Sequence, residues 1–206
     1  MTPTSLILVA PLLLIALLLG ASNPTQAEQP KKLRNATRGL PGPRAQTGAK
    51  ESCPDFVIEL AEKWGQVFDV PREWICSQAF VESTNDPSKK NRKSGAMGLL
   101  QVMPLTAVWH IEKLKRLGNS LIKNTIARLW KGRTTDLLNP DLNVMIAAAH
   151  MKFLQNIFGD NHDLVAAAYD AGHNKILRLL REGKPLPAES RLYIAMVHEA
   201  KLRGYV

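Results

Sequence analysis

A single carboxylate, Glu82, ends an otherwise apolar run, and this position makes it a candidate catalytic residue. At helical spacing Glu82 shares one stripe with Ile75 and Ala79, so its carboxyl group is expected among apolar neighbours. Loss of solvation raises the pKa of a carboxyl group, and a glutamic acid that stays protonated near neutral pH can donate a proton to a leaving oxygen. Cleavage of a glycosidic bond requires such a general acid. The alternative is an exposed glutamate at a helix end, which the periodicity alone favours.

A second catalytic carboxylate is not evident near Glu82. Glycosidases with two carboxylates hold the second one close to the first, and the nearest candidate here is Asp86. Because Asp86 precedes Pro87, it is typical of a turn that starts a loop. The loop that follows contains the cations Lys89, Lys90, Arg92 and Lys93. Such cations would recognise carboxylates of a ligand, lower the pKa of Glu82, or belong to a solvated loop. The sequence therefore favours a mechanism that uses one carboxylate.

The elements that must position Glu82 are predicted to be helices. Apolar residues recur at three- and four-residue spacing from Pro54 onward, with Pro54 in a first turn, and a second helix is expected over about 72–83. Asn139 and Pro140 are residue types typical of a helix N-cap and first turn, and Gly172 is expected to stop another helix. Further helices are predicted near 107–117, 120–130, 174–183 and 189–202. No segment alternates as a strand does, so residues 52–206 are predicted to form one mainly α domain.

The first 51 residues differ from the rest in composition. Residues 6–20 are apolar and uncharged, but short for a membrane span and interrupted by Pro11. We expect residues 1–27 to be an export signal cleaved after Ala27, with an uncleaved membrane anchor as the alternative. Residues 28–51 are rich in Pro, Gly and cations and predict a disordered basic linker, which would also suit a membrane surface. The expected location is the periplasm, with anchoring to the inner membrane if the signal is retained.

The net charge of the chain indicates which class of partner it attracts. The chain has 27 basic and 18 acidic residues, a formal charge of +9, which attracts polyanions. The predicted export and the lack of a recognised binding motif argue against nucleic acid as a partner.

The two cysteines leave two possibilities open. Cys53 and Cys76 either form a disulfide in an oxidising compartment or remain thiols, with Cys76 as a small core residue. No metal site is expected, because no other ligand lies at a suitable spacing.

Four motifs follow one another along the sequence: the Glu-Ser that precedes a loop and "GAMGLLQVMP", then "NPDLNVMIAAAHMKFL", "AAAYDAG" and "LPAESRLYIAMV". In this order they resemble the motifs of the lytic transglycosylase family, which has a lysozyme-like (SLT-type) catalytic domain. The resemblance covers about residues 54–200. It implies a single lysozyme-like helical domain with a glycan-binding cleft, acting as a monomer on peptidoglycan glycan strands without a metal or organic cofactor.

The resemblance also implies roles for particular residues. Glu82 would be the only catalytic acid/base: it would protonate the β-1,4 glycosidic oxygen between N-acetylmuramic acid and N-acetylglucosamine, then accept a proton from the muramyl C6 hydroxyl. That hydroxyl would close on C1 and leave a 1,6-anhydro end. The residues implied to bind substrate are Ser83, Gln101, Met103, Tyr169, Asp170 and Tyr193. Tyr169 would bond either Glu82 or the substrate.

The sequence departs from the family pattern in the basic loop 88–94, which is one residue longer than usual, and at other places. Asp170 replaces an Asn, and a carboxylate there would raise the pKa of Glu82. His150 stands where a Tyr is frequent and is expected to be a packed helix residue. The connection 104–136 is long and strongly basic. This connection would form a wall of the cleft, a docking face for a secretion or conjugation apparatus, or a helical hairpin that covers the core.

Two other functions remain as alternatives. The changed loop and Asp170 are compatible with an inactive scaffold protein that binds peptidoglycan. The same Glu82 would also serve a hydrolytic muramidase, whose products carry reducing ends.

Overall fold

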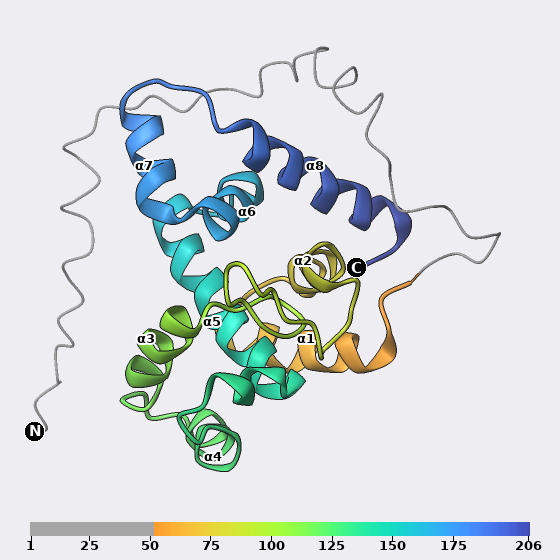
Figure 1. Cartoon of the computed structure of the whole chain (residues 1–206), viewed down its shortest axis with the longest axis vertical. Helices are drawn as coiled ribbons and strands as arrows, with labels where there is room; N and C mark the ends of the chain where they lie inside the picture. Colours follow the sequence, from red (N-terminus) through yellow and green to blue (C-terminus); the bar gives the residue numbers. More distant parts are fainter. Residues whose placement is uncertain (1–51) are drawn as a thin grey trace, which may run out of the picture. The chain divides into compact units, whose positions relative to one another are not determined.

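The computed structural model describes residues 52–206 (Figure 1). The expected signal or anchor and the basic linker, residues 1–51, lie outside the described residues. The helices are α1 (Asp55–Phe68), α2 (Arg72–Ser83), α3 (Pro104–Leu114), α4 (Ser120–Leu129), the 3-10 helix η2 (Thr134–Leu138), α5 (Pro140–Phe158), α6 (His162–Ala171), α7 (His173–Arg181) and α8 (Ala188–Arg203). Over this range there is no β-strand, only isolated bridges that join Met97 to Lys90 and to Val102. None of these helices is long and apolar enough to cross a bilayer. The mainly α prediction is confirmed.

Helix α5 is the centre around which α1, α3 and α6 pack (Figure 1). As predicted, it begins with Asn139, whose side chain accepts a hydrogen bond from the Leu142 amide, and with Pro140 in the first turn. Residues 147–149 are alanines, and all are buried. Their small side chains leave room for the neighbouring helices to approach closely.

Helix α2 holds Glu82 in its last turn. The helix ends at Ser83, as the spacing predicted, and Thr84 follows in the left-handed conformation with φ 57°. Helices α1 and α8 pack along α2. Helix α1 differs slightly from the expectation, because Pro54 is its N-cap and the first helical residue is Asp55. Pro54 has an extended conformation, with ψ 142°, which a first-turn residue does not adopt.

A buried side chain, Asn143, fastens the segment between α2 and α3 to α5. Its amide oxygen accepts from the Leu100 amide at 2.9 Å, and its Nδ2 donates to the carbonyls of Met97 and Leu137, each at 2.8 Å. Gly98 lies against this group with φ +79°, and a Cβ there would come within 2.4 Å of both Nδ2 of Asn143 and the Leu137 carbonyl oxygen. The close approach of a helix to Gly98 requires glycine at that position.

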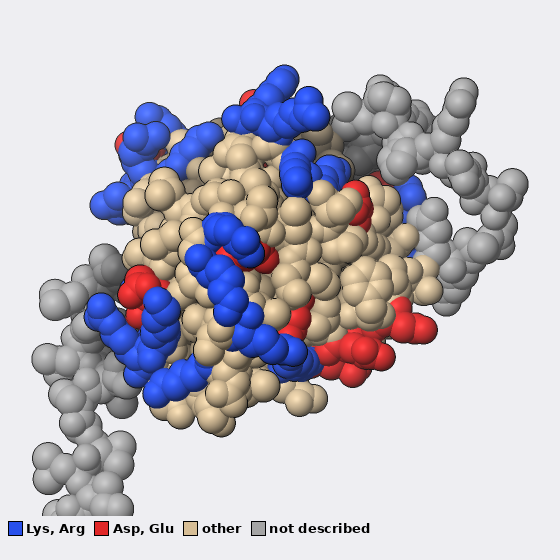
Figure 2. All heavy atoms as spheres, turned by 60° about the horizontal axis from the view of Figure 1, so that its bottom comes forward, with Lys and Arg blue, Asp and Glu red and all other residues tan. Residues whose placement is uncertain are grey.

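The long basic connection folds as α3, α4 and η2. Helices α3 and α4 pack on α5 and bury Ile111, Leu114, Ile122 and Ile126, so they cover the core. Figure 2 brings this side of the molecule forward and shows Lys and Arg residues spread over it. Part of this charge is paired, for example between Arg128 and Asp141 at 3.1 Å. The helical-hairpin interpretation describes the observed packing, and the other two roles stay predictions.

The two cysteines are buried and lie together. Cys53 precedes α1, Cys76 is in the middle of α2, and both are free thiols, close enough for each to shift the pKa of the other. The structure thus shows Cys76 as the core residue that one alternative expected.

Candidate active site

The carboxyl group of Glu82 meets α8 at the end of α2. The hydroxyl of Tyr193, itself 9% exposed, donates a hydrogen bond of 2.7 Å to Oε1 of Glu82. Burial is the largest influence on this carboxyl group and raises the pKa of Glu82 to about 7. The hydrogen bond from Tyr193 acts in the opposite direction, because a donor stabilises the ionised form. Glu82 therefore has both of its protonation states available near neutral pH.

Two charged neighbours shift the pKa of Glu82 in opposite directions. The carboxylate of Asp170 raises the pKa of Glu82, while the ammonium group of Lys89 lowers it. Both directions agree with the predictions made for Asp170 and for the basic loop. Asp170 is held in place by Ser190, whose hydroxyl donates to it at 3.0 Å.

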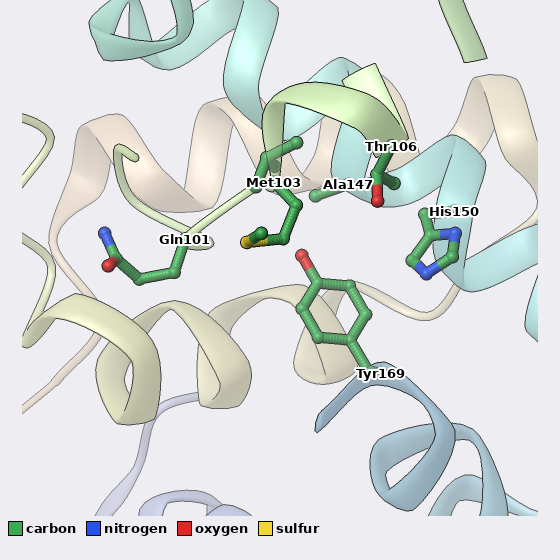
Figure 3. A pocket seen from close by; sticks show the side chains of 7 residues that line it. Gln101, Met103, Thr106, Ala147, His150 and Tyr169 are labelled. Atoms are coloured by element: carbon green, nitrogen blue, oxygen red, sulfur yellow. The ribbon is translucent and has the colours of Figure 1, made fainter. Parts of the chain in front are cut away.

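Figure 3 shows a small pocket whose wall includes the ring of Tyr169. It is lined by Gln101, Val102, Met103, Thr106, Ala147, His150 and Tyr169. Gln101, Met103 and Tyr169 thus come together, as the resemblance implied. Burial raises the pKa of Tyr169, and the charge on Glu82 raises it further, so this phenol is within electrostatic reach of the carboxyl group. Glu82 does not itself line the pocket, and Tyr169 links the two.

The structure assigns the bond to Glu82 to Tyr193 and not to Tyr169, so for Tyr169 the contact with substrate stays a prediction. The hydroxyl of Tyr169 donates to the Leu100 carbonyl at 2.8 Å, and Tyr193 is the residue that bonds Glu82. The Gln101 side chain is hydrogen-bonded to the backbone of the loop: its Nε2 donates to the carbonyls of Gly98 at 2.8 Å and Lys89 at 3.3 Å. These bonds fix the positions of the side chains that line the pocket.

Ser83 is not brought to the pocket. It is 2% exposed, and its hydroxyl donates to the Ala79 carbonyl in the preceding turn of α2. One residue along a helix turns the side chain by about 100°, which directs Ser83 into the core beside Glu82. A direct contact between Ser83 and a ligand is therefore not supported by its position.

Sequence reasoning missed Thr106, Ala147 and His150 as pocket residues. His150 was expected to be only a packed helix residue, but it lines the pocket one turn after Ala147 on α5. The available signals were its place where the family frequently has Tyr, and its spacing of three from Ala147. Over residues 52–206, no group of three or more His, Cys, Asp or Glu side chains is arranged to hold a metal ion.

Replacing Tyr193 with Phe is expected to raise the pKa of Glu82. The change removes the donor that stabilises the carboxylate, and the loss of one such hydrogen bond corresponds to roughly one pH unit. Carbon-13 NMR of glutamate-labelled protein would follow the titration. Tyr169→Phe is the matched control, because its hydroxyl bonds a backbone carbonyl and not Glu82. Equal shifts in both variants would contradict the assignment of Tyr193.

Comparison with known proteins places this fold and site in a family. A family model described as "Transglycosylase SLT domain" matches residues 59–190, a range that contains Glu82 and the whole pocket. The chain belongs to the Transglycosylase SLT domain family.

Its relatives include lytic murein transglycosylases. The chain is 24% identical over 157 residues to the soluble lytic murein transglycosylase of Escherichia coli K12, covering 76% of this chain and 22% of that protein. It is 29% identical over 101 residues to the endo-type membrane-bound lytic murein transglycosylase A of Klebsiella pneumoniae MGH 78578, covering 48% of this chain and 43% of that one. The chain thus spans about a fifth of the length of the soluble relative.

A solved structure shows the same fold. The crystal structure of the 70 kDa soluble lytic transglycosylase from Escherichia coli superimposes with a TM-score of 0.59 at 24% identity, covering 71% of this chain and 23% of that one. The lysozyme-like helical fold that the motifs implied is confirmed.

Proposed function

We propose that this protein is a peptidoglycan lytic transglycosylase that cleaves the β-1,4 bond between N-acetylmuramic acid and N-acetylglucosamine and leaves 1,6-anhydro-muramyl ends. The observation that carries this proposal is the partly buried Glu82, hydrogen-bonded to Tyr193 and with its pKa raised to about 7, within a Transglycosylase SLT domain. A group of this pKa is suited both to give and to accept a proton near neutral pH. The names of the relatives support the same activity.

The reaction needs only one carboxyl group that acts twice. Protonated Glu82 donates its proton to the glycosidic oxygen, the bond from that oxygen to the muramyl C1 breaks, and the N-acetylglucosamine side leaves as an alcohol. The Glu82 carboxylate then takes the proton from the muramyl C6 hydroxyl, whose oxygen forms the new bond to C1. Glu82 ends the cycle protonated, and no water is consumed. Holding the C6 hydroxyl next to C1 supplies a large effective concentration.

The surrounding residues have supporting roles in this proposal. Tyr193 orients the carboxyl group and keeps the pKa of Glu82 from rising further, and Asp170 opposes Lys89. Gln101, Met103 and Tyr169 bind the glycan in the pocket, where the exposed Met103 offers an apolar surface to a sugar ring. Ser83 supports the end of α2 from inside.

The cellular setting is part of the proposal. The substrate, peptidoglycan, lies outside the inner membrane, which agrees with the predicted export to the periplasm and with the basic linker as a tether. The cationic side formed by α3 and α4 would be the docking face for a secretion or conjugation apparatus, with the enzyme acting as a monomer. The charge of +9 also favours an anionic wall polymer as substrate.

Digestion of purified peptidoglycan by the full chain tests this function. Mass spectrometry of the soluble muropeptides is expected to show anhydro products, each one water lighter than the corresponding reducing product. Reducing ends would identify a hydrolytic muramidase. Binding to peptidoglycan without any release would identify a scaffold protein.

A further inference from the structure

Two imidazoles meet at the wall of the pocket. His110 on α3 is 4% exposed, and its Nε2 lies 3.0 Å from Nδ1 of His150 on α5. His150 lines the pocket with Thr106, near Tyr169, whose ring centroid is 5.5 Å from that of His150 (Figure 3). His110 lies behind His150, so the pair joins the pocket wall to the interior of the α3–α5 contact.

The short distance between the two nitrogens allows only one proton in that bond. One ring must donate and the other must accept, so the two rings cannot both carry a second proton without breaking the contact. Burial, the larger cause in both rings, lowers the pKa of His110 to about 3 and that of His150 to about 4. Lys113 and His173 add to the effect on His110 and His150 respectively. The pair is neutral in the pH range in which Glu82 titrates.

The direction of the hydrogen bond follows from the chemistry of the side chain. A neutral histidine intrinsically favours the form with the proton on Nε2. If His110 donates from Nε2 to Nδ1 of His150, both rings have this favoured form. The reverse arrangement would place both protons on Nδ1. With this direction, His150 has an Nε2–H group, and this nitrogen makes no hydrogen bond to any of the described residues.

We propose that His150 is a specificity-determining residue whose Nε2–H donates a hydrogen bond to a neutral oxygen of a bound N-acetyl sugar, and that His110 is the positioning residue that fixes this tautomer. The inference rests on the proposed function, since it assigns a ligand group to the same pocket. An uncharged donor suits an acetamido carbonyl or a hydroxyl oxygen. It lacks the positive charge with which an imidazolium ion would attract a carboxylate in preference to these neutral acceptors.

Binding of chitotetraose, an uncharged N-acetylglucosamine tetramer, tests this assignment without depending on cleavage. The measurements use the full chain in a Glu82→Gln background and isothermal titration calorimetry. His150→Phe keeps a ring but removes the donor, and is expected to weaken binding by about tenfold. His150→Tyr supplies a hydroxyl donor and is expected to restore most of the affinity. His198→Gln, at an exposed residue paired with Asp163, is the control and is expected to bind as the parent does.

Nitrogen-15 NMR of the imidazoles gives a readout that a purely structural role would not move. Nε2 of His150 is expected to be protonated in the parent, and His110→Phe is expected to give a mixture of His150 tautomers with a several-fold loss of affinity. Equal affinity of His150→Phe and the parent would overturn the inference, as would an unprotonated Nε2 in the parent. If the unsubstituted chain releases anhydro-muropeptides but the Glu82→Gln parent does not bind chitotetraose, the inference fails and the proposed function stands. If neither occurs, both fail.

Discussion

Substitution of Glu82 by Gln is expected to reduce the release of anhydro-muropeptides by at least about 10³-fold. The amide keeps the shape of the side chain and can still contact Tyr193, but it can neither give a proton to the glycosidic oxygen nor take one from the C6 hydroxyl. Both steps of the proposed mechanism therefore lose the same group. Release rates from purified peptidoglycan, quantified by mass spectrometry at equal protein concentration, would check the effect. Substantial activity in this variant would show that another group is the acid.

The same variant should be more stable than the parent at alkaline pH, which distinguishes loss of chemistry from loss of fold. The pKa of Glu82 is about 7 in the folded protein against an ordinary 4.5, so the folded state holds more protons than the unfolded state between these values. Stability therefore falls as pH rises through this window. Gln has no such penalty, and we expect a gain of about 2 kcal/mol at pH 8 after allowing for partial exposure of the carboxyl group. Urea unfolding at pH 8 and at pH 4 should show the gain only at the higher pH.

Gly98→Ala is expected to have the largest effect on stability, a loss of at least about 3 kcal/mol. A left-handed φ of +79° costs about 1 kcal/mol for a residue with a side chain. The new Cβ would also lie 2.4 Å from the Leu137 carbonyl oxygen and from Nδ2 of Asn143, so one of the hydrogen bonds of Asn143 must break. The atom of Leu137 in this contact is its backbone carbonyl oxygen, so rotating a side chain cannot relieve the contact.

Gly95→Ala provides a matched control for this prediction. Gly95 has almost the same φ, +80°, but a Cβ at this position would have no heavy atom within 4 Å. Only the conformational cost of about 1 kcal/mol is expected. Urea unfolding of both variants compares them directly. Equal losses would show that Asn143 and Leu137 move aside easily.

Local signals explain why much of the helical framework was predictable. The limits of α2, the Asn139–Pro140 start of α5 and the Gly172 end of α6 all depend on residues within one turn of the boundary. Two helix starts were exceptions: α3 begins at Pro104, three residues before the predicted start at 107, and Pro54 is the N-cap of α1 and not a first-turn residue. Both the N-cap and the first turn tolerate proline, so the residue type alone does not distinguish them.

The partners of the site residues were less accessible to sequence reasoning. Which tyrosine bonds Glu82 depends on how α8 packs on α2, and no local pattern contains that information. The contact between His110 and His150 likewise joins two helices 40 residues apart. Ser83 was predicted to bind substrate because it follows Glu82 in the motif. Helix geometry, however, turns the Ser83 side chain away from the pocket. Individual contacts between helices needed the folded structure.

The bond between Glu82 and Tyr193 joins residues that are 111 positions apart, and Tyr193 is on the last helix of the chain. During synthesis, the chain contains Glu82 long before α8 exists to cover it. Until then the carboxyl group is more hydrated, and because burial is the largest cause of its raised pKa, it remains an ordinary, ionised glutamate at neutral pH even though the Tyr193 donor is absent. Docking of α8 converts it into a proton donor. Under the proposed mechanism, an unfinished or C-terminally truncated chain would hold Glu82 in a form that does not donate its proton at neutral pH, and activity would arise only when the last helix is in place.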